Sequence, residues 1–354
     1  MSEARLDFTL NSEQTMLRDS ARRYLAQAGG ASWQGYAELG WLGIAAPEDA
    51  GGLGGGMADL AILAEELGRA LAPEPFADGA VLATRLVDRL VVGHRREALL
   101  GEMIAGTRRL AAALYEPGRR YELAPQTTAV RDGGGYRLSG TKVLVMDGAA
   151  ADDLLVTAAL DGGVALFLVG REQAGVDGRA YRTVDRRDCA DFRLDVTVEA
   201  DRLLSGNALD AVEDALDEAR LCLCADMLGG MDSAIEMTAE YLKTRTQFGQ
   251  KLATFQALQH SVADLFIDAD SVRSSLLRAI PAFGGERAAR RKAVSACWVN
   301  TFETAKRVTG MAVHLHGAIG FTTEYRVGHY LRRAIVSERL FGDVEFHLAR
   351  YMEG

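Results

Sequence analysis

The sequence has few cysteines and prolines and no long apolar run. Its 354 residues include 4 cysteines and 6 prolines. Four cysteines without a C-x-x-C pair exclude a disulfide scaffold and give no zinc signature, so we expect reduced, mostly buried thiols and no metal site. The first residues have no apolar signal core, and no stretch reaches the roughly 18 apolar residues of a membrane helix. These absences predict a cytoplasmic protein with no membrane insertion.

Basic residues are also fewer than acidic residues. The chain has 40 Lys and Arg against 49 Asp and Glu, which gives a formal net charge of −9. Such a field repels phosphate backbones and anionic lipid, so nucleic acid is not an expected partner. The remaining composition, 48% hydrophobic and 25% charged, is that of a globular chain with room for two or three domains.

Hydrophobic periodicity divides the chain into residues 1–108, 109–206 and 207–354. The first segment is mainly helical, and its glycine cluster GGLGGG lacks the G-K-[ST] ending of a phosphate loop, so we interpret it as a turn before a helix. The second consists of short β-rich runs, and the third has apolar residues at steps of three and four. We therefore expect a mainly α fold with a small β domain: an N-terminal helical domain, a middle β barrel or sandwich, and a C-terminal four-helix bundle.

Two segments of the third domain place polar, glycine and aromatic residues where a bundle favours helix formers. They are RTQFGQKLATFQ at 245–256 and HLHGAIGF at 314–321. An arginine beside a glycine turn suits a diphosphate, because the guanidinium offers a bidentate fork and a helix end adds its dipole. From the residues alone, a solvated cap is the simpler interpretation of Arg245, and a glycine-closed helix end is the simpler one for the histidines.

In this order the segments resemble the acyl-CoA dehydrogenase family over essentially the whole chain. Residues 245–256 are similar to its R-x-x-F-G-x-x-x-x-x-F-Q segment, and HGAIGFTTEYRVGHYLRRA at 316–334 is similar to its late glycine and Arg-Arg/Asp segment. The resemblance implies FAD as cofactor and an acyl-CoA as substrate, in fatty acid or sterol side-chain β-oxidation. A glutamate removes the α-proton while flavin N5 takes a hydride from the β-carbon.

The resemblance also implies partners and cofactor contacts. The expected partners are a second subunit of the family, as in a heterotetramer, or a second copy, and an electron-transfer flavoprotein or similar acceptor. In the family, the Arg and Phe of the R-x-x-F-G segment contact the ADP half of the FAD held by the neighbouring subunit. If the matching residues of this chain make the same contacts, Arg245 binds the diphosphate. The residues around the adenosine half are then Gln247, Phe248, Phe255, Gln256, His314, Gly317 and Ala318.

Both positions at which the family carries its catalytic glutamate hold other residues. The position one turn past the Arg-Arg segment is Phe341, and the alternative, 26 residues before Arg245, is Ala219. The nearest carboxylates are Glu218 and Glu338. Glu218 is one residue away from Ala219, and one residue corresponds to a rotation of about 100° around a helix. Its side chain is therefore expected to point away from the position of the base. Glu338 is expected to be a surface ion-pair partner of an arginine. The candidate arginines are Arg332, Arg333 and Arg339. No catalytic residue is therefore assigned.

The flavin-ring side departs from the family as well. YEPGRRYE at 115–122 stands where the family has Thr-Glu-Pro-Gly-x-Gly-Ser-Asp, and KVLVM at 142–146 stands where it often has Lys-x-Trp-Ile-[TS]. Small and hydroxyl-bearing residues have become bulky, charged or apolar. These changes predict a weakened flavin-ring site in this chain.

Three hypotheses follow. The first is a non-catalytic partner in a heteromeric acyl-CoA dehydrogenase, as known for bacterial enzymes acting on bulky sterol-derived acyl-CoAs, with FAD only at the unlike interface. The second is an active homo-oligomer that uses Glu218 or Glu338 as a displaced base. The third covers a flavin-dependent monooxygenase, a nitroalkane oxidase or a structural subunit without flavin, all on the same fold. A lost base beside a preserved Arg245 and Phe248 favours the first.

Overall fold

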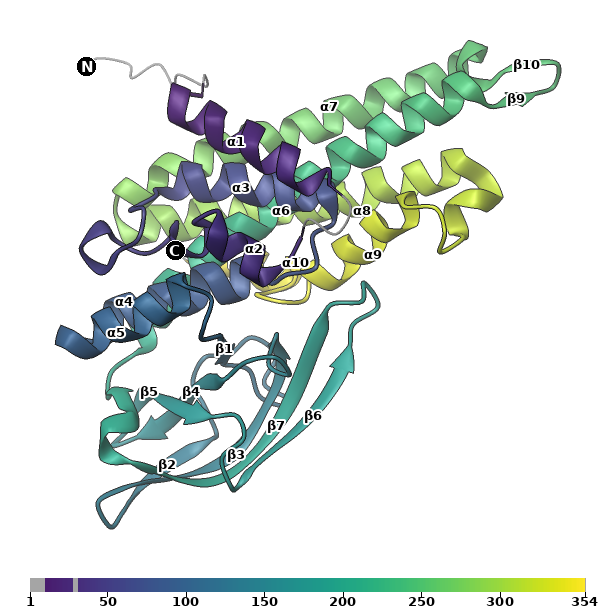
Figure 1. Cartoon of the computed structure of the whole chain (residues 1–354). Helices are drawn as coiled ribbons and strands as arrows, with labels where there is room; N and C mark the ends of the chain where they lie inside the picture. Colours follow the sequence, from purple (N-terminus) through teal and green to yellow (C-terminus); the bar gives the residue numbers. More distant parts are fainter. Residues whose placement is uncertain (1–9, 28–30, 354) are drawn as a thin grey trace.

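The computed structural model describes residues 10–27 and 31–353 (Figure 1). Helices come first, strands follow, and a second set of helices ends the chain. The expected fold class, mainly α with a small β domain between two helical domains, is therefore confirmed. In the described residues, no helix is both long enough and apolar enough to cross a membrane.

The N-terminal helices pack against the first helix of the bundle. They are α1 (Ser12–Leu25), α2 (Trp33–Glu38), η1 (Trp41–Gly43), η2 (Glu48–Ala50), α3 (Met57–Ala70), the π-helix η3 (Phe76–Ala83), α4 (Thr84–Leu90) and α5 (Gly93–Ile104). Helix α3 crosses α6 (Leu209–Thr244) so closely that a Cβ at Gly68 would lie 1.8 Å from the carbonyl oxygen of Asp226. A Cβ at Gly229 would lie 1.9 Å from that of Glu65. Only glycine allows this approach.

The β domain is one mixed eight-stranded sheet. Its strands are β1 (Leu110–Ala113), β2 (Thr128–Asp132), β3 (Gly135–Met146), β4 (Asp153–Leu160), β5 (Gly163–Gly170), β6 (Val176–Arg182), β7 (Asp188–Glu199) and β8 (Leu203–Ser205), with η4 (Ala200–Arg202) before the last. The order is β6-β7-β3-β2-β4-β5-β8, and β1 pairs in parallel with β4. The β3–β7 register shifts between Lys142 and Val145, where Leu144 has a φ of 55°. A bulge of this kind re-aims the side chains around it.

The C-terminal bundle extends away from the β domain. Its remaining helices are α7 (Gln256–Ala279), α8 (Arg287–His316), α9 (Val327–Ser337) and α10 (Val344–Glu353), with short helices η5 (Leu252–Thr254), η6 (Ile280–Gly284) and η7 (Gly317–Phe321). Strands β9 (Thr246–Gln247) and β10 (Gln250–Lys251) form a hairpin between α6 and α7. Figure 1 shows this hairpin at the tip of the bundle, far from the β domain.

The main core joins both helical domains and the facing side of the sheet. A second core fills the β domain alone, built from residues such as Leu154, Phe167 and Phe192. All four cysteines are unpaired and buried, as expected. The domains therefore share one interior, and the candidate site residues lie either inside it or at the projecting tip.

Candidate functional site

The hairpin between α6 and α7 holds an exposed aromatic ring in a strained backbone conformation. Gln247 pairs with Gln250, and the two turn residues between them, Phe248 and Gly249, have φ values of 53° and 78°. This geometry is typical of a tight hairpin turn that favours glycine or asparagine at both positions. Phe248 is nevertheless a phenylalanine, 88% exposed, in edge contact with Phe255 at 6.2 Å between ring centroids. The chain's own core gains little from this ring.

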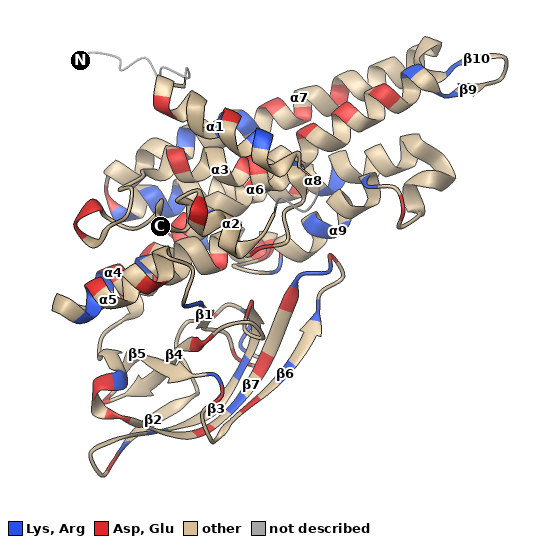
Figure 2. Cartoon of the chain, viewed as in Figure 1, with Lys and Arg blue, Asp and Glu red and all other residues tan. Residues whose placement is uncertain are grey.

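Arg245 lies at the base of the same hairpin. Its backbone N–H donates to the carbonyl of Tyr241 at 2.9 Å and so caps α6. Its side chain is exposed, and within residues 10–27 and 31–353 it has no ion pair. Figure 2 shows Lys and Arg residues, in blue, along the hairpin and at the adjoining helix end. Gln247 and Gln256 are exposed as well. The diphosphate and adenosine contacts implied by the resemblance therefore lie on an open surface.

The late glycine segment closes α8 at the same end of the bundle. Gly317 has a φ of 65° at the helix C-terminus, and a Cβ at Gly320 would lie 2.6 Å from the carbonyl oxygen of Val313. His316, which sequence reasoning did not assign a role, is buried and stacks on Tyr241 at 4.5 Å between centroids. Burial lowers the pKa of His316. This stacking joins the end of α8 to the end of α6, while His314 and Ala318 face solvent.

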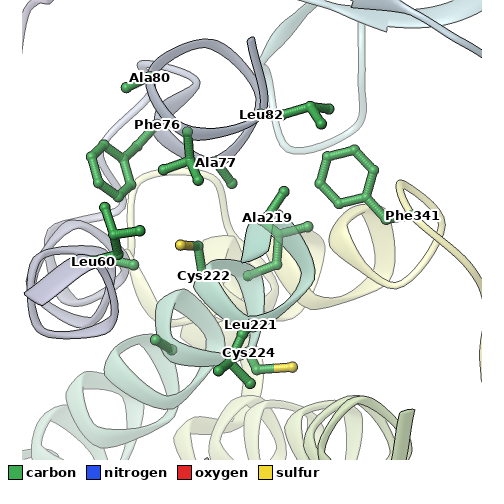
Figure 3. Close-up of a cluster of buried hydrophobic side chains, with 14 of the residues drawn as sticks. Leu60, Phe76, Ala77, Ala80, Leu82, Ala219, Leu221, Cys222, Cys224 and Phe341 are labelled. Atoms are coloured by element: carbon green, nitrogen blue, oxygen red, sulfur yellow. The ribbon is translucent and has the colours of Figure 1, made fainter. Parts of the chain in front are cut away.

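The two family base positions, distant in sequence, come together inside the core. Ala219 is fully buried and Phe341 is 4% exposed. Figure 3 shows the Phe341 ring beside Ala219, with Leu82 and Cys222 close by. The Arg220 side chain donates from Nε to the carbonyl of Phe341 at 2.9 Å and fixes this segment. Neither an alanine methyl nor a phenylalanine ring can accept a proton, so neither position holds a catalytic base.

The two displaced-base candidates are bound in ion pairs. Glu218 accepts from Arg85 Nε at 2.7 Å and from Arg89, both on α4. Glu338 is only 5% exposed, so the expected surface position is wrong. Its carboxylate accepts from Lys306 Nζ at 2.9 Å. Of the three arginines expected as its partners, Arg339 lies 4.0 Å away and Arg333 instead pairs with Asp226 at 2.7 Å. Both carboxylates are therefore engaged with cationic side chains of this chain's own fold.

Aromatic side chains fill the flavin-ring side. The rings of Tyr115 and Tyr121 lie 5.9 Å apart, and Tyr121 lies 5.4 Å from Phe346 of α10. The pocket that borders Met146 measures about 100 Å³. Ligand pockets usually measure roughly 300 Å³ or more. The hairpin residues therefore suit the ADP half of FAD, and the cavity that borders Met146 is too small for the isoalloxazine ring.

A buried lysine anchors the loop that replaces the family's flavin-ring run. Lys142 is fully buried, and its Nζ donates to Glu116 at 2.7 Å and to Thr157 at 3.0 Å. Burial lowers the pKa of Lys142 to about 8. Burial alone would raise the pKa of Glu116, but hydrogen bonds from Lys142 and Thr127 hold it below its ordinary value. The sequence signal, a lysine at an inward-facing strand position, could have revealed this pair.

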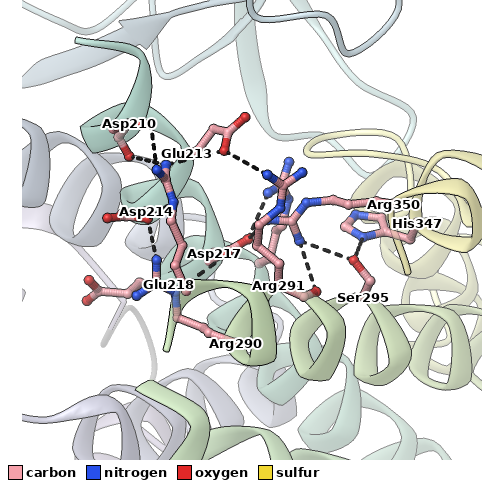
Figure 4. Close-up of polar contacts among 12 residues, drawn as sticks. Asp210, Glu213, Asp214, Asp217, Glu218, Arg290, Arg291, Ser295, His347 and Arg350 are labelled. Atoms are coloured by element: carbon pink, nitrogen blue, oxygen red, sulfur yellow. Dashed lines mark hydrogen bonds and ion pairs between the residues drawn. The ribbon is translucent and has the colours of Figure 1, made fainter. Parts of the chain in front are cut away.

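The largest pocket near these residues, about 340 Å³, opens between this loop, α6 and α10. Its charged wall is neutralised by a network of ion pairs (Figure 4). Asp217 accepts from Arg220 at 2.9 Å and from Arg350 at 2.6 Å. Burial and the neighbouring Arg220 lower the pKa of Arg350 to about 10. Glu213 pairs with Arg291 at 3.4 Å. The pocket therefore reaches Arg220, the neighbour of Ala219, and the nearby Asp217 carboxylate is held by Arg220 and Arg350.

Comparison with known proteins identifies the family. Residues 11–106 match the model described as acyl-CoA dehydrogenase, N-terminal domain, and residues 207–354 match acyl-CoA dehydrogenase, C-terminal domain. The chain is 31% identical to acyl-CoA dehydrogenase FadE27 of Mycobacterium tuberculosis over 90% of this chain and 86% of that protein.

Two solved structures extend this similarity to the whole chain. A variant of the Tcur3481-Tcur3483 steroid ACAD is 34% identical with a TM-score of 0.86. The ChsE4-ChsE5 complex from Mycobacterium tuberculosis is 28% identical with a TM-score of 0.87. Each similarity covers 98% of both chains. FAD is the cofactor of the acyl-CoA dehydrogenase family, whose members are oxidoreductases that act on CH–CH bonds. By its sequence, its fold and the hairpin that carries Arg245, the chain belongs to the acyl-CoA dehydrogenase family.

Proposed function

We propose that this chain is the non-catalytic partner in a heteromeric acyl-CoA dehydrogenase. It completes the ADP side of an FAD site whose flavin ring and catalytic glutamate belong to a second, catalytic subunit of the family. The observation that carries the proposal is the contrast between Arg245 and Phe248, exposed and unused by the chain's own fold, and Ala219 and Phe341, packed in the core. A bound FAD would supply the hydride acceptor for α,β-dehydrogenation.

Exposed apolar side chains near the hairpin support a partner surface. Phe321 is 73% exposed on η7, Ile267 is 67% exposed and Phe266 is 52% exposed on α7, and Ile319 is 41% exposed. Monomeric proteins rarely leave large apolar surfaces open. The similar ChsE4-ChsE5 structure is a complex of two named components. We therefore infer an unlike subunit of the same fold as the partner, placed over the tip of the bundle.

In such an assembly the side chains of this chain bind and orient. The Arg245 guanidinium would neutralise the diphosphate, and the exposed Phe248 ring would cover the adenosine half. The proton from the substrate α-carbon has no acceptor at Ala219 or Phe341, so it must pass to a carboxylate of the catalytic subunit. The transferred electrons would leave through an electron-transfer flavoprotein or a similar acceptor. The similarity to a steroid enzyme favours a bulky sterol-derived acyl-CoA, and a cytoplasmic location remains the prediction.

Flavin content tests the proposal. Expressed alone, the chain should purify with far less than one FAD per subunit, because bulky and charged residues replace the small residues of the family's flavin-ring run. Co-expression with a family member that has an intact glutamate should give a yellow complex. A single chain that binds one FAD and oxidises acyl-CoA would refute the proposal and favour the active homo-oligomer. A complex that forms without FAD would favour the structural subunit.

A further inference from the structure

The three domains meet at a polar seam that the proposed function does not use. An outer cavity of about 100 Å³ and an inner one of about 10 Å³ share Glu74, Pro75 and Arg187 in their walls. The outer cavity also touches Arg109 and Asp147. The inner wall adds Asp78, Cys222, Asp226 and Arg333. The inner cavity is about the size that holds a single water molecule.

Asp78 is the unusual residue of this seam. It lies on the π-helix η3 and is 6% exposed. Within the described part of the chain, its carboxyl forms no ion pair, and its hydrogen bond comes from its own backbone N–H. The nearby arginines are engaged elsewhere, since Arg187 pairs with Asp185 and Arg333 with Asp226, each at 2.7 Å. A buried carboxyl without a partner is costly when ionised. Single π-helical turns are frequent at functional sites.

Two unpartnered polar atoms belong to this region, one on the outer cavity and one near the charges of the seam. Tyr36 is fully buried, and its hydroxyl has no hydrogen-bond partner among the described residues. It lies near the charges of Glu74, Arg333 and Asp226. Arg109 Nε, on the outer cavity, also has no hydrogen-bond partner there and lies 3.4 Å from Asp147. Buried groups of this kind are usually satisfied by ordered water. The seam therefore offers a polar route from the outer cavity to Asp78.

Two carboxyls along this route titrate near neutrality. Burial raises the pKa of Asp78 to about 6, although Arg187 and Arg333 oppose the shift. Burial raises the pKa of Asp147 to about 7 against the effect of Arg109, and Asp78 adds to this rise. The other groups that face Asp78 are Tyr115 from the end of β1, Asp185 and Cys189 from the β6–β7 region, and Cys222 and Asp226 from α6.

We propose that Asp78, with Asp147 at the outer end of the seam, forms a proton-linked site that sets how firmly the β domain docks against the helical domains. Protonated, the Asp78 side chain is neutral and is accommodated inside η3. Ionised, it places an unpaired charge in the interior, which weakens the packing of η3 against α6 and β1. The inference is independent of the proposed partner role.

The pH dependence follows from proton binding. The folded-state pKa of Asp78 lies above its ordinary value of 3.8, so the folded chain holds more protons than the unfolded chain between about pH 4 and pH 6. Stability therefore falls as the pH rises through this window and then levels off. Asp147 extends the fall to about pH 7. A shift of roughly two pKa units corresponds to about a hundredfold change in the unfolding equilibrium.

Denaturation of the full chain between pH 4 and pH 8 tests the site. Between pH 4 and pH 8, the folding equilibrium constant of Asp78→Asn should fall about a hundredfold less than that of the wild type. Relative to the wild type, the variant should therefore be more stable at pH 8 than it is at pH 4. Asp195→Asn is the matched control, because Asp195 is exposed, and its hydrogen bond from Arg137 lowers its pKa. The control should keep the wild-type slope above pH 5. An Asp78→Asn variant with the wild-type slope would overturn the proposal.

Hydrogen exchange of the unmodified chain provides a second test if Asp78→Asn does not fold. After correction for intrinsic exchange rates, protection of residues 76–83 should fall up to about a hundredfold from pH 4.5 to pH 8, while strands β4 and β5 stay protected. Equal protection of residues 76–83 at both pH values would overturn the proposal.

Discussion

The hairpin at the tip of the bundle and the core around Ala219 and Phe341 differ in how their charged groups are placed. Those of the hairpin are exposed, and those of the core are ion-paired. Arg245 is exposed and without an ion pair in the described chain, and the neighbouring Phe248 keeps a strained backbone in solvent. In the core, Glu218 and Glu338 are each held by cations, and Phe341 fills the position of a catalytic carboxylate. In the proposed assembly the first region serves another molecule, and the second serves the stability of this chain.

The proposed role accounts for this difference, because a non-catalytic subunit can lose the base and keep its contacts to a partner. A vacated active site inside a core must be refilled, because a cavity or an unpaired charge costs stability. Residues of a surface hairpin are in contact with water, so the chain's own stability does not require them to be replaced. The proposed role accounts for the strained phenylalanine of the hairpin by a contact outside the chain.

The largest expected effect is on kcat of the assembled complex, and it distinguishes the glutamate of the catalytic subunit from Glu218 of this chain. Replacing the glutamate of the catalytic subunit should lower kcat by roughly 10²–10⁴-fold, the usual contribution of a general base. Glu218→Gln should leave kcat within a few fold but destabilise this chain by about 1.5–3 kcal/mol, because Arg85 and Arg89 lose a charged acceptor. Dye reduction driven by acyl-CoA and denaturation of the same samples measure both. A loss above a hundredfold in Glu218→Gln, with unchanged stability, would mean that this chain carries its own base.

The second prediction concerns the core ion pair between α6 and α9. Arg333 donates two hydrogen bonds to Asp226 and a third to the carbonyl of Ala72. Arg333→Met leaves a buried carboxylate without its partner, which should cost about 3–5 kcal/mol in denaturation experiments. The double variant Arg333→Met with Asp226→Leu should recover part of that loss. If the double variant were as unstable as the single one, the ion pair would not be the source of the effect.

The third prediction concerns cofactor retention. Arg245→Ala in the complex should weaken FAD retention about 10- to 150-fold, since a charge-assisted contact to a diphosphate contributes roughly 1.5–3 kcal/mol. Arg245→Lys should recover only part, because an ammonium lacks the bidentate fork. Lys243→Ala is the matched control, since Lys243 is exposed nearby and pairs with Glu240 at 2.6 Å. Fluorescence of released flavin measures retention, and equal retention in both arginine variants would make Arg245 a solvated cap.

The smallest effect concerns the strained turn. Phe248→Gly should change the stability of the isolated chain by no more than about 1 kcal/mol, because the released backbone strain offsets the flexibility of glycine. The same variant should weaken assembly with the catalytic subunit or its FAD retention. Titration by analytical ultracentrifugation and thermal unfolding measure the two properties. A large loss of stability in the isolated chain would show that the ring serves this fold after all.

The sequence by itself determined the order of the domains and the surface motif. Apolar spacing of three and four residues marked the long helices, and the run from Arg245 to Gln256 marked the hairpin between two of them. It also showed that Ala219 and Phe341 cannot accept a proton. Each of these features depends on residues that are neighbours in the chain, so local patterns are enough to predict them.

Only the tertiary structure decided how the charges are matched. It brought Arg85 and Arg89 to Glu218, Lys306 to Glu338 and Lys142 to Glu116, and it left Asp78 unpaired between domains. The expected surface position of Glu338 was wrong for this reason. Burial and ion pairing arise where distant segments pack together, and the desolvation energy that controls them is not set by nearby residues in the sequence.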